Sequence, residues 1–239
     1  MILPRSLIKQ RGFITPPFFA VFQRRIVPTD SDWANVVLLL GNDDAANGTT
    51  TFTDQSASAH SMTRGGGVVY SSAQAATGMT TSIALDGSGD SLSTALGADF
   101  QFAGDFTIEA YVRLASLAEN SIVWQWNTFA PALYIDTLGR LSIYSGAQTV
   151  LNTSALSTNT WYHVAFVRSG TTLHAYKDGT AGTGTTYSAT TSNSGTGYIG
   201  TDTGGQDLNG FINSLRITKG VARYTATFTP PALPLPSAG

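Results

Sequence analysis

Carboxylates and histidines are the side chains that could carry acid–base chemistry in this chain. Hydrolysis of a glycosidic bond needs two carboxyl groups that flank it, about 5 Å apart in retaining enzymes. Glu109 is the only acid in its alternating segment, residues 106–114, where Thr107 and Tyr111 occupy the positions two residues away. One carboxylate cannot serve as both acid and nucleophile. We therefore interpret Glu109 as a structural strand residue and predict no catalytic residue.

The three histidines form no catalytic or zinc motif. His163 and His174 could face one another across a hairpin, but no serine or cysteine nucleophile motif accompanies them, and no third metal ligand lies within local spacing of them or of His60. The chain contains no cysteine, which excludes disulfides, thiolate nucleophiles and cysteine-bound zinc. We therefore expect a protein that is not an enzyme.

These residues lie on what we predict to be short β-strands separated by turns. In residues 160–179, T-W-Y-H-V-A-F-V-R-S-G-T-T-L-H-A-Y-K-D-G, two alternating runs are joined by Ser169-Gly170 and followed by a turn at Asp178-Gly179. A hairpin is not stable alone, so it must belong to larger sheets. Regular short strands with glycine-containing turns indicate a sandwich or barrel rather than parallel βαβ units. The other predicted strands are residues 36–40, 49–54, 68–70, 82–86, 91–96, 106–114, 121–126, 132–136, 140–145, 148–152, 196–200 and 211–218.

Several of these segments, in this order, resemble the laminin G-like, concanavalin A-like jelly-roll domains. The resemblance covers roughly residues 34–232 and rests on the hairpin above, on D-F-T-I-E-A-Y-V-R at 105–113 and on G-F-I-N-S-L-R-I-T-K-G-V-A-R-Y at 210–224. The last segment continues as T-A-T-F-T-P-P and is similar to copies found in tailed-phage virion proteins. The resemblance implies an all-β fold, a two-sheet antiparallel jelly-roll β-sandwich of the concanavalin A-like kind.

Many domains of this family hold calcium, so the resemblance directs attention to aspartates in loops. Ca²⁺ takes about six to eight oxygen ligands from carboxylates and backbone carbonyls. The segment D-G-S-G-D at 86–90 lacks the spacing and the closing glutamate of an EF-hand, and aspartates also form turns by bonding nearby backbone N–H groups. The candidate calcium ligands are Asp43, Asp86, Asp90, Asp202 and Asp207.

Aromatic residues between 124 and 144 offer a possible surface for sugars. A glycan site would present exposed aromatic rings with Asn, Asp and Gly in loops at one edge of the sandwich. Aromatic residues also fill β-sandwich cores, and the core is the alternative position for the two tryptophans. The candidate ligand-binding residues are Trp124, Trp126, Asn127, Tyr134 and Tyr144.

Charge is scarce and unevenly distributed along the chain. Charged residues make up 12% of the sequence, about half the usual share, and a net charge of −2 gives no reason to expect nucleic-acid binding. Residues 1–29 contain five basic residues and no acid, whereas the remainder has 8 basic and 15 acidic residues. We interpret residues 1–30 as an extended arm that becomes ordered on a partner; the alternative is an arm that packs along its own domain. The anchoring residues of this arm are Arg5, Lys9, Arg11, Phe18, Phe19, Arg24 and Arg25.

No targeting or membrane signal stands out. No apolar run reaches the eighteen or so residues of a membrane helix, so we expect no membrane insertion. Pro16-Pro17 interrupts the apolar run at 13–22, and no small-residue cleavage site follows, so we do not expect secretion by a signal peptide.

We predict three parts: an extended N-terminal arm (1–30), a jelly-roll domain (31–232) and a Pro-rich C-terminal tail (233–239). The resemblance implies a non-enzymatic structural protein on the exterior of a phage particle, as capsid decoration or as part of the tail or fibres. Its partners would be other virion proteins and further copies of itself. The alternative is an adhesin module that binds a receptor or a glycan such as cell-surface polysaccharide, with calcium as its one candidate cofactor.

Overall fold

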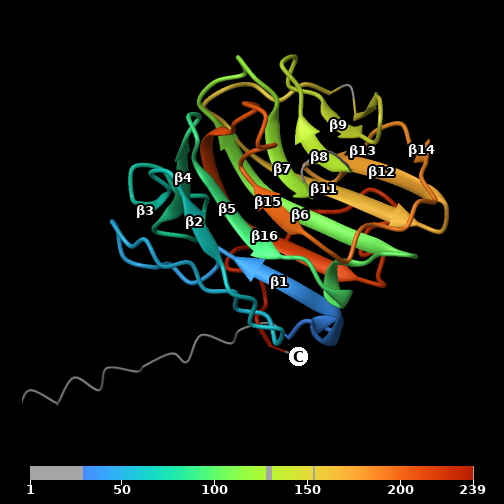
Figure 1. The fold of residues 1–239 in the computed structure, drawn as a ribbon, viewed down its shortest axis with the longest axis horizontal. Helices are drawn as coiled ribbons and strands as arrows, with labels where there is room; N and C mark the ends of the chain where they lie inside the picture. The colour runs from blue at the N-terminus through green and yellow to red at the C-terminus, as the bar shows by residue number, and fades with distance from the viewer. Residues whose placement is uncertain (1–28, 128–130, 153, 239) are drawn as a thin grey trace, which may run out of the picture.

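The computed structural model describes residues 29–127, 131–152 and 154–238, which form two antiparallel β-sheets packed against each other (Figure 1). The larger sheet has nine strands. Its main path runs in the order β13-β12-β11-β6-β16-β4-β3, with β1 paired to β16 and β14 paired to β12. Its strands are β1 (Val36–Leu40), β3 (Val69–Ser71), β4 (Ser82–Asp86), β6 (Phe106–Leu114), β11 (Trp161–Ser169), β12 (Thr172–Lys177), β13 (Thr180–Ala181), β14 (Thr185–Thr186) and β16 (Asn209–Lys219).

The smaller sheet has seven strands in the order β10-β9-β8-β7-β15-β5-β2. In the described residues, one single-turn 3₁₀ helix, η1 (Trp33–Asn35), precedes β1, and another, η2 (Ala98–Phe100), lies between β5 and β6. Within the described ranges, no helix has the length and apolar character needed to cross a membrane. The prediction of an all-β, two-sheet antiparallel sandwich is confirmed. The strands of the smaller sheet are β2 (Thr63–Gly65), β5 (Ser91–Ala95), β7 (Ser121–Trp126), β8 (Ala132–Ile135), β9 (Leu141–Tyr144), β10 (Gln148–Asn152) and β15 (Thr196–Ile199).

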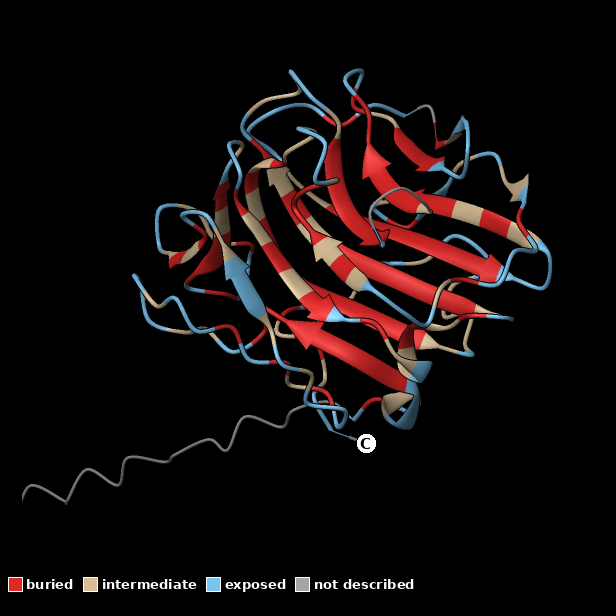
Figure 2. Ribbon diagram, viewed as in Figure 1, coloured by how far each residue is buried: buried red, intermediate tan, exposed pale blue. Residues whose placement is uncertain are grey.

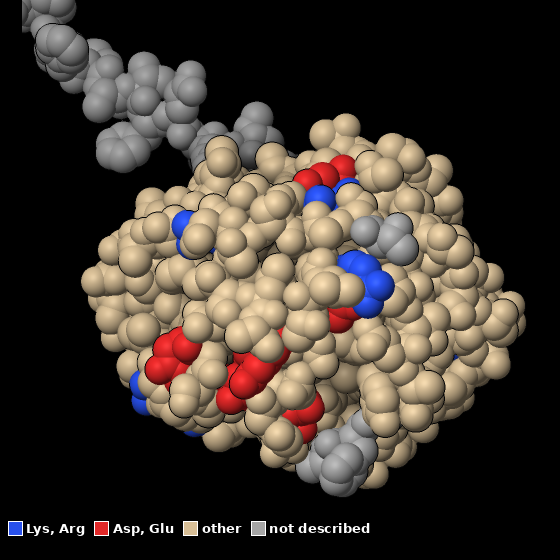
Figure 3. Space-filling view, turned by 90° about the horizontal axis from the view of Figure 1, so that it is seen from above, with Lys and Arg blue, Asp and Glu red and all other residues tan. Residues whose placement is uncertain are grey.

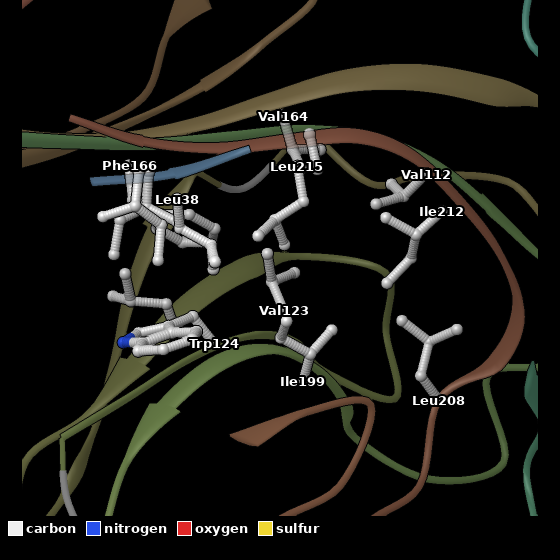
Figure 4. Close-up of a cluster of buried hydrophobic side chains, with 14 of the residues drawn as sticks. Leu38, Val112, Val123, Trp124, Val164, Phe166, Ile199, Leu208, Ile212 and Leu215 are labelled. Atoms are coloured by element: carbon white, nitrogen blue, oxygen red, sulfur yellow. The ribbon is translucent and has the colours of Figure 1, made fainter. Parts of the chain in front are cut away.

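Alternation along the strands places apolar side chains between the two sheets. In β6, Ile108 and Val112 are completely buried, and most of the length of the long central strands is buried as well (Figure 2). Figure 4 shows Trp124 of the smaller sheet facing Leu38 and Phe166 of the larger one. Burial of a large apolar side chain contributes about 1.5–3 kcal/mol, so this shared core is the main source of stability.

The chain's own C-terminal segment covers the outer face of the nine-stranded sheet. Tyr224 and Phe228 stack on each other with ring centroids 3.6 Å apart and pack against Val167 and Tyr176. Further along, the hydroxyl of Tyr111 donates to the carbonyl of Pro231 at 2.6 Å. Both faces of β11 are therefore buried, one by the sandwich core and the other by this segment.

The last residues of this segment also pack on the domain. Leu233 and Leu235 are 7% and 1% exposed and join Val36 and Leu39 in a second apolar cluster. The N–H of Asp30 donates to the carbonyl of Ala238 at 2.8 Å, which joins the two ends of the described chain. The structure thus places Asp30 and the residues predicted as a separate tail within the domain itself.

The predicted strands mostly agree with those observed. Residues 49–54 form no strand and contribute only an isolated bridge between Thr53 and Ser61, so that prediction is wrong. Strand β2 was not predicted, because its three residues show no alternation. The turn at Asp178-Gly179 is confirmed, since both residues adopt positive φ, 46° and 78°.

Candidate functional site

A pocket of about 420 Å³ lies on the outer face of the seven-stranded sheet, the side turned away from the core. Its apolar floor comes from Ile122 of β7 with Ala132 and Tyr134 of β8, which form a small cluster of their own. Tyr144, at the end of β9, contributes a further aromatic ring. The loop between β15 and β16 completes the pocket. The lining residues are Asn120, Ile122, Gln125, Ala132, Tyr134, Tyr144, Asp202, Thr203, Gly204 and Gln206.

A β-bulge in β7 decides which of its side chains reach the pocket. The register between β7 and β8 shifts between Ile122 and Trp124. A bulge interrupts the simple alternation of a strand and redirects side chains. As a result Val123 and Trp124 are both completely buried in the core, while Ile122 and Gln125 line the pocket.

Hydrogen bonds hold the β15–β16 loop in the shape that borders the pocket. Asp202 Oδ1 accepts from the N–H groups of Gly204 (2.7 Å) and Gln206 (3.0 Å). Gln125 Nε2 donates to the Asp202 carbonyl at 3.3 Å, and the N–H of Asn120 donates to Gln206 Oε1 at 3.1 Å. No hydrogen bond from the described residues reaches Asp202 Oδ2, so this oxygen can accept one from a ligand.

The same loop carries local backbone strain. Thr203 is exposed and has a φ of 63°. Positive φ is unusual for a β-branched residue, and such strain costs on the order of 1–3 kcal/mol. Strained residues concentrate at ligand-binding sites, and Thr203 lies at the rim of this pocket.

Two tyrosines give the pocket its aromatic character. Tyr144 is 41% exposed and, with Leu138, is one of two large hydrophobic residues that are exposed in the described part of the chain. Burial, reinforced by the charge of Asp136, raises the pKa of Tyr134 to about 12, so its hydroxyl stays protonated at neutral pH. An exposed ring beside amide, hydroxyl and carboxylate groups offers a ligand one apolar face and several hydrogen bonds.

The five residues predicted to bind a ligand are divided between core and surface. Tyr134 and Tyr144 line the pocket, whereas Trp124 and Trp126 are 0% and 1% exposed. The assignment of both tryptophans to a ligand site is therefore corrected: Trp124 packs on Phe100, and Trp126 Nε1 donates to the Phe100 carbonyl at 3.0 Å. Asn127 is exposed at the end of β7 with a φ of 56°, outside the set of lining residues.

Sequence reasoning missed the polar half of this pocket. Asn120, Gln125, Thr203 and Gln206 were not singled out, and Asp202 was assigned to calcium. These polar residues are brought together by contacts between segments about 80 residues apart, such as the hydrogen bond from Asn120 to Gln206. The local signal that was available is the polar, glycine-rich run T-D-T-G-G-Q at 201–206.

The aspartates proposed as calcium ligands form loop hydrogen bonds. Asp90, which is buried, accepts from the N–H groups of Gly67 and Asp86, and Asp207 Oδ2 accepts from the N–H of Gly89 at 2.8 Å. Across the described residues, no three acidic or histidine side chains come together as metal ligands. In the structure these aspartates hold loop backbone in place, and calcium binding by them stays a prediction. The remaining three candidates also accept hydrogen bonds: Asp86 and Asp202 from backbone N–H groups of their own loops, and Asp43 from the Tyr70 hydroxyl.

Glu109, the candidate acid, is fully buried on the outer side of the nine-stranded sheet, beneath the C-terminal segment. Arg216 donates to Glu109 Oε1 from Nε (2.9 Å) and Nη2 (2.7 Å). On the other oxygen, Oε2, the Tyr224 hydroxyl donates at 2.7 Å and His163 Nε2 lies 3.0 Å away. Burial alone would raise the pKa of Glu109, but Arg216, His163 and Tyr224 together hold that pKa well below its usual range.

This ion-pair network extends to the start of the described chain. Arg216 Nη1 and Arg223 Nη2 each lie 2.9 Å from Asp30 Oδ2. Burial raises the pKa of Asp30, but Arg223 and Arg216 outweigh burial and leave it lowered. The network joins β6, β11 and β16 to Asp30 near the start of the described chain and to the C-terminal segment that follows β16. It lies away from the pocket, so its role is structural.

The remaining sequence predictions concern the histidines and the arm. His163 and His174 do not face each other, because His174 pairs with Val167 across the hairpin. His60 lies 3.2 Å from Asp99. The arm residues Arg5, Lys9, Arg11, Phe18, Phe19, Arg24 and Arg25 lie outside the described residues.

Several solved structures share this fold. Domain 4 of AbnA, a GH43 extracellular arabinanase from Geobacillus stearothermophilus solved with arabinotriose, has a TM-score of 0.61 at 15% identity, with 78% of this chain and 93% of that domain covered. The botulinum neurotoxin serotype D binding domain has a TM-score of 0.58 at 17% identity, covering 79% of this chain and 49% of that one. Trypanosoma rangeli sialidase in complex with the inhibitor DANA has a TM-score of 0.52 at 17% identity, covering 80% and 31%. The chain therefore spans about half the length of the toxin domain and less than a third of the sialidase.

Comparison with family models identifies the family of this chain. No curated protein matches the chain. A family model described as the concanavalin A-like lectin/glucanases superfamily matches residues 86–223, which is more than half of the sequence and runs from the end of β4 past the end of β16. The chain belongs to the concanavalin A-like lectin/glucanases superfamily.

Proposed function

We propose that this domain is a carbohydrate-binding module and that the pocket on its seven-stranded sheet binds one sugar unit of a glycan. The observation that carries the proposal is the pairing of an exposed ring, Tyr144, with polar side chains around a hollow of about 420 Å³. Sugars present an apolar face of C–H groups and a rim of hydroxyls, and pockets for such ligands combine aromatic surface with a few fixed polar groups.

Each part of the pocket has a function in this proposal. The ring of Tyr144 packs on the apolar face of the sugar. The hydroxyl of Tyr134 donates a hydrogen bond to an oxygen of the sugar, either its ring oxygen or one of its hydroxyls. Asp202 Oδ2 accepts from sugar hydroxyls, while its other oxygen keeps the loop in place through Gly204 and Gln206. Because these bonds exist without a ligand, little ordering is required on binding, which favours affinity.

The comparisons support the choice of ligand class. The arabinanase domain was solved with arabinotriose, and the binding domain of botulinum neurotoxin DC, with a TM-score of 0.53 at 12% identity, was solved in complex with SialylT. We propose sugar binding without hydrolysis. In support, Asp202 is the one carboxylate among the described lining residues, and glycoside hydrolysis ordinarily needs two.

A glycan array probed with the labelled full-length chain tests the proposal. We expect saturable binding to at least one glycan, weakened about tenfold by Tyr144→Ala, which corresponds to about 1.4 kcal/mol. Leu138→Ala removes the other exposed large side chain, lies outside the pocket, and should leave affinity unchanged. A chelator should also have no effect. Absence of binding to every glycan would refute the proposal.

The location of the protein on a phage particle remains our proposal from the sequence resemblance. The supporting feature is the basic, apolar arm at residues 1–28, which we propose docks the domain onto other virion proteins while the pocket stays free. Deleting residues 1–28 should leave a folded domain that binds glycan but no longer incorporates into particles. Normal incorporation of the truncated chain would refute the docking role and leave the sugar-binding proposal intact.

A further inference from the structure

The charge around the pocket has one sign. Among the described residues that line it there is no Lys, Arg or His, and the one charged side chain is the carboxylate of Asp202. A second acid, Glu119, is exposed next to the lining residue Asn120, and its Oε2 accepts from the N–H of Asp207 at 3.3 Å. Viewed from above the fold of Figure 1, Lys and Arg as well as Asp and Glu form small separate groups on a mostly uncharged surface (Figure 3).

Arg140, the basic residue nearest in sequence to the lining residues, is already paired with a carboxylate. Arg140 follows the β8 strand that supplies the pocket floor, and its Nη2 lies 2.7 Å from Asp136 Oδ2. Its Nε donates to the same oxygen at 2.8 Å. This two-point ion pair fixes the guanidinium on Asp136, so it supplies no free positive charge to an anionic ligand.

Asp202 itself is suited to hydroxyl groups rather than to anions. Its Oδ1 is occupied by two backbone N–H groups, and its Oδ2 accepts no hydrogen bond from the described residues. A carboxylate only accepts hydrogen bonds, so it favours a ligand that donates them, as a sugar hydroxyl does. A second carboxylate brought beside it would meet like-charge repulsion without a compensating cation.

Resting on the proposed function, we infer that the pocket selects a neutral sugar unit and rejects acidic ones, namely sialic acid, uronic acids and sulfated sugars. The discrimination comes from Asp202 and from the absence of a basic side chain in the lining. It acts through charge, so the gap between neutral and acidic sugars should narrow as salt is added.

Matched glycan pairs test this inference with the full-length chain. The probes are lactose and N-acetyllactosamine, each with and without an α2,3-linked sialic acid, and xylotriose with and without a glucuronic acid branch, alongside a wide neutral and acidic array. In every glycan that binds, we expect the sugar unit in the pocket to be neutral. Its acidic counterpart should bind at least about tenfold more weakly at low salt. Equal or tighter binding of acidic counterparts overturns this inference and leaves sugar binding standing, whereas no binding at all overturns the proposed function itself.

Two variants separate charge from shape. Asp202→Asn keeps an Oδ1 that can accept from Gly204 and Gln206, so the loop should keep its form while the gap between neutral and acidic sugars closes. Thr203→Lys adds a positive charge at an exposed rim position that already has positive φ, and it should raise the affinity for the acidic member of each pair. Asp44→Asn is the matched control, because it removes one negative charge outside the pocket from an aspartate whose Oδ1, like that of Asp202, accepts from a backbone N–H. If the difference in affinity between neutral and acidic sugars is as large in Asp202→Asn as in the control, the inference is wrong.

Discussion

Replacing Glu109 by glutamine should destabilise the fold more than any change of similar size at the surface. Glu109 is completely buried, accepts two hydrogen bonds from Arg216 and one from Tyr224, and lies against His163. Glutamine keeps the shape but removes the charge, and it turns one acceptor oxygen into a donor that faces other donors. Breaking a buried ion pair by removing one partner costs about 3–5 kcal/mol, and we expect a loss of that order.

Urea unfolding followed by tryptophan fluorescence measures this loss, because Trp124 and Trp126 lie in the core. The wild type and Glu109→Gln should share one m value, so that the shift in midpoint reports stability. Glu119→Gln is the control, since Glu119 is exposed and its change should cost at most about 0.5 kcal/mol.

A double variant separates the cost of a broken pair from the value of the pair itself. Replacing Glu109 by leucine together with Arg216 by methionine leaves no unpaired charge between these two positions, so it should cost less than either single change. A Glu109→Gln loss below about 1 kcal/mol would refute the view that this pair is desolvated and tightly bonded, and so would a double variant as unstable as the sum of the singles.

Three further predictions concern the same fold. Glu109 and Asp30 have lowered pKa values in the folded state, so the unfolded chain takes up protons first as the pH decreases. Stability should therefore fall below the ordinary pKa of a glutamate, 4.5, and of an aspartate, 3.8. Tm measured against pH should decline in this range, and it should decline less steeply in Glu109→Gln. Leu235→Ala should cost about 2–5 kcal/mol in urea unfolding because Leu235 is 1% exposed, whereas Leu138→Ala, at 63% exposure, should cost almost nothing. Gly179→Ala should lower Tm more than Gly170→Ala. Both glycines have positive φ, but an added Cβ would meet the Phe228 carbonyl only at Gly179. Equal losses of Tm at the two sites would contradict the close packing of the C-terminal segment.

Local patterns were enough to predict most strands from the sequence. The bounds of β4, β6, β7 and β10 match the predicted segments, because each combines an alternating or apolar run with a turn at its end. Residues 49–54 alternate equally well but form no strand. There Phe52 stacks on Tyr70 of β3 at 5.0 Å and joins the main core, so it is buried although its own segment does not pair as a strand.

The site was less predictable, because its residues are brought together by features without a local signal. The bulge in β7 sends Val123 and Trp124 inward together, which no simple alternation predicts, and it makes Gln125 a pocket residue. Glu109 was recognised as structural, but its partner Arg216 is 107 residues away and could not be identified from spacing. Tyr134 and Tyr144 were predicted as ligand-binding residues because they belong to a cluster of aromatic residues in the sequence, although Tyr134 proves to be only 4% exposed.

The two outer faces of the sandwich differ in a way that favours the pocket as the binding surface. On the nine-stranded sheet, Tyr224, Phe228 and Leu235 fill the outer face with the chain's own residues, and the buried Glu109 network fastens that cover. On the seven-stranded sheet, the equivalent face keeps a hollow bordered by Tyr144 and Asp202. A ligand that bound the first face would have to displace a cover held by buried ion pairs, whereas the second face can accept one without rearrangement. Any partner that recognises this domain through a sheet face should therefore compete with glycan, and a variant such as Tyr144→Ala should weaken both.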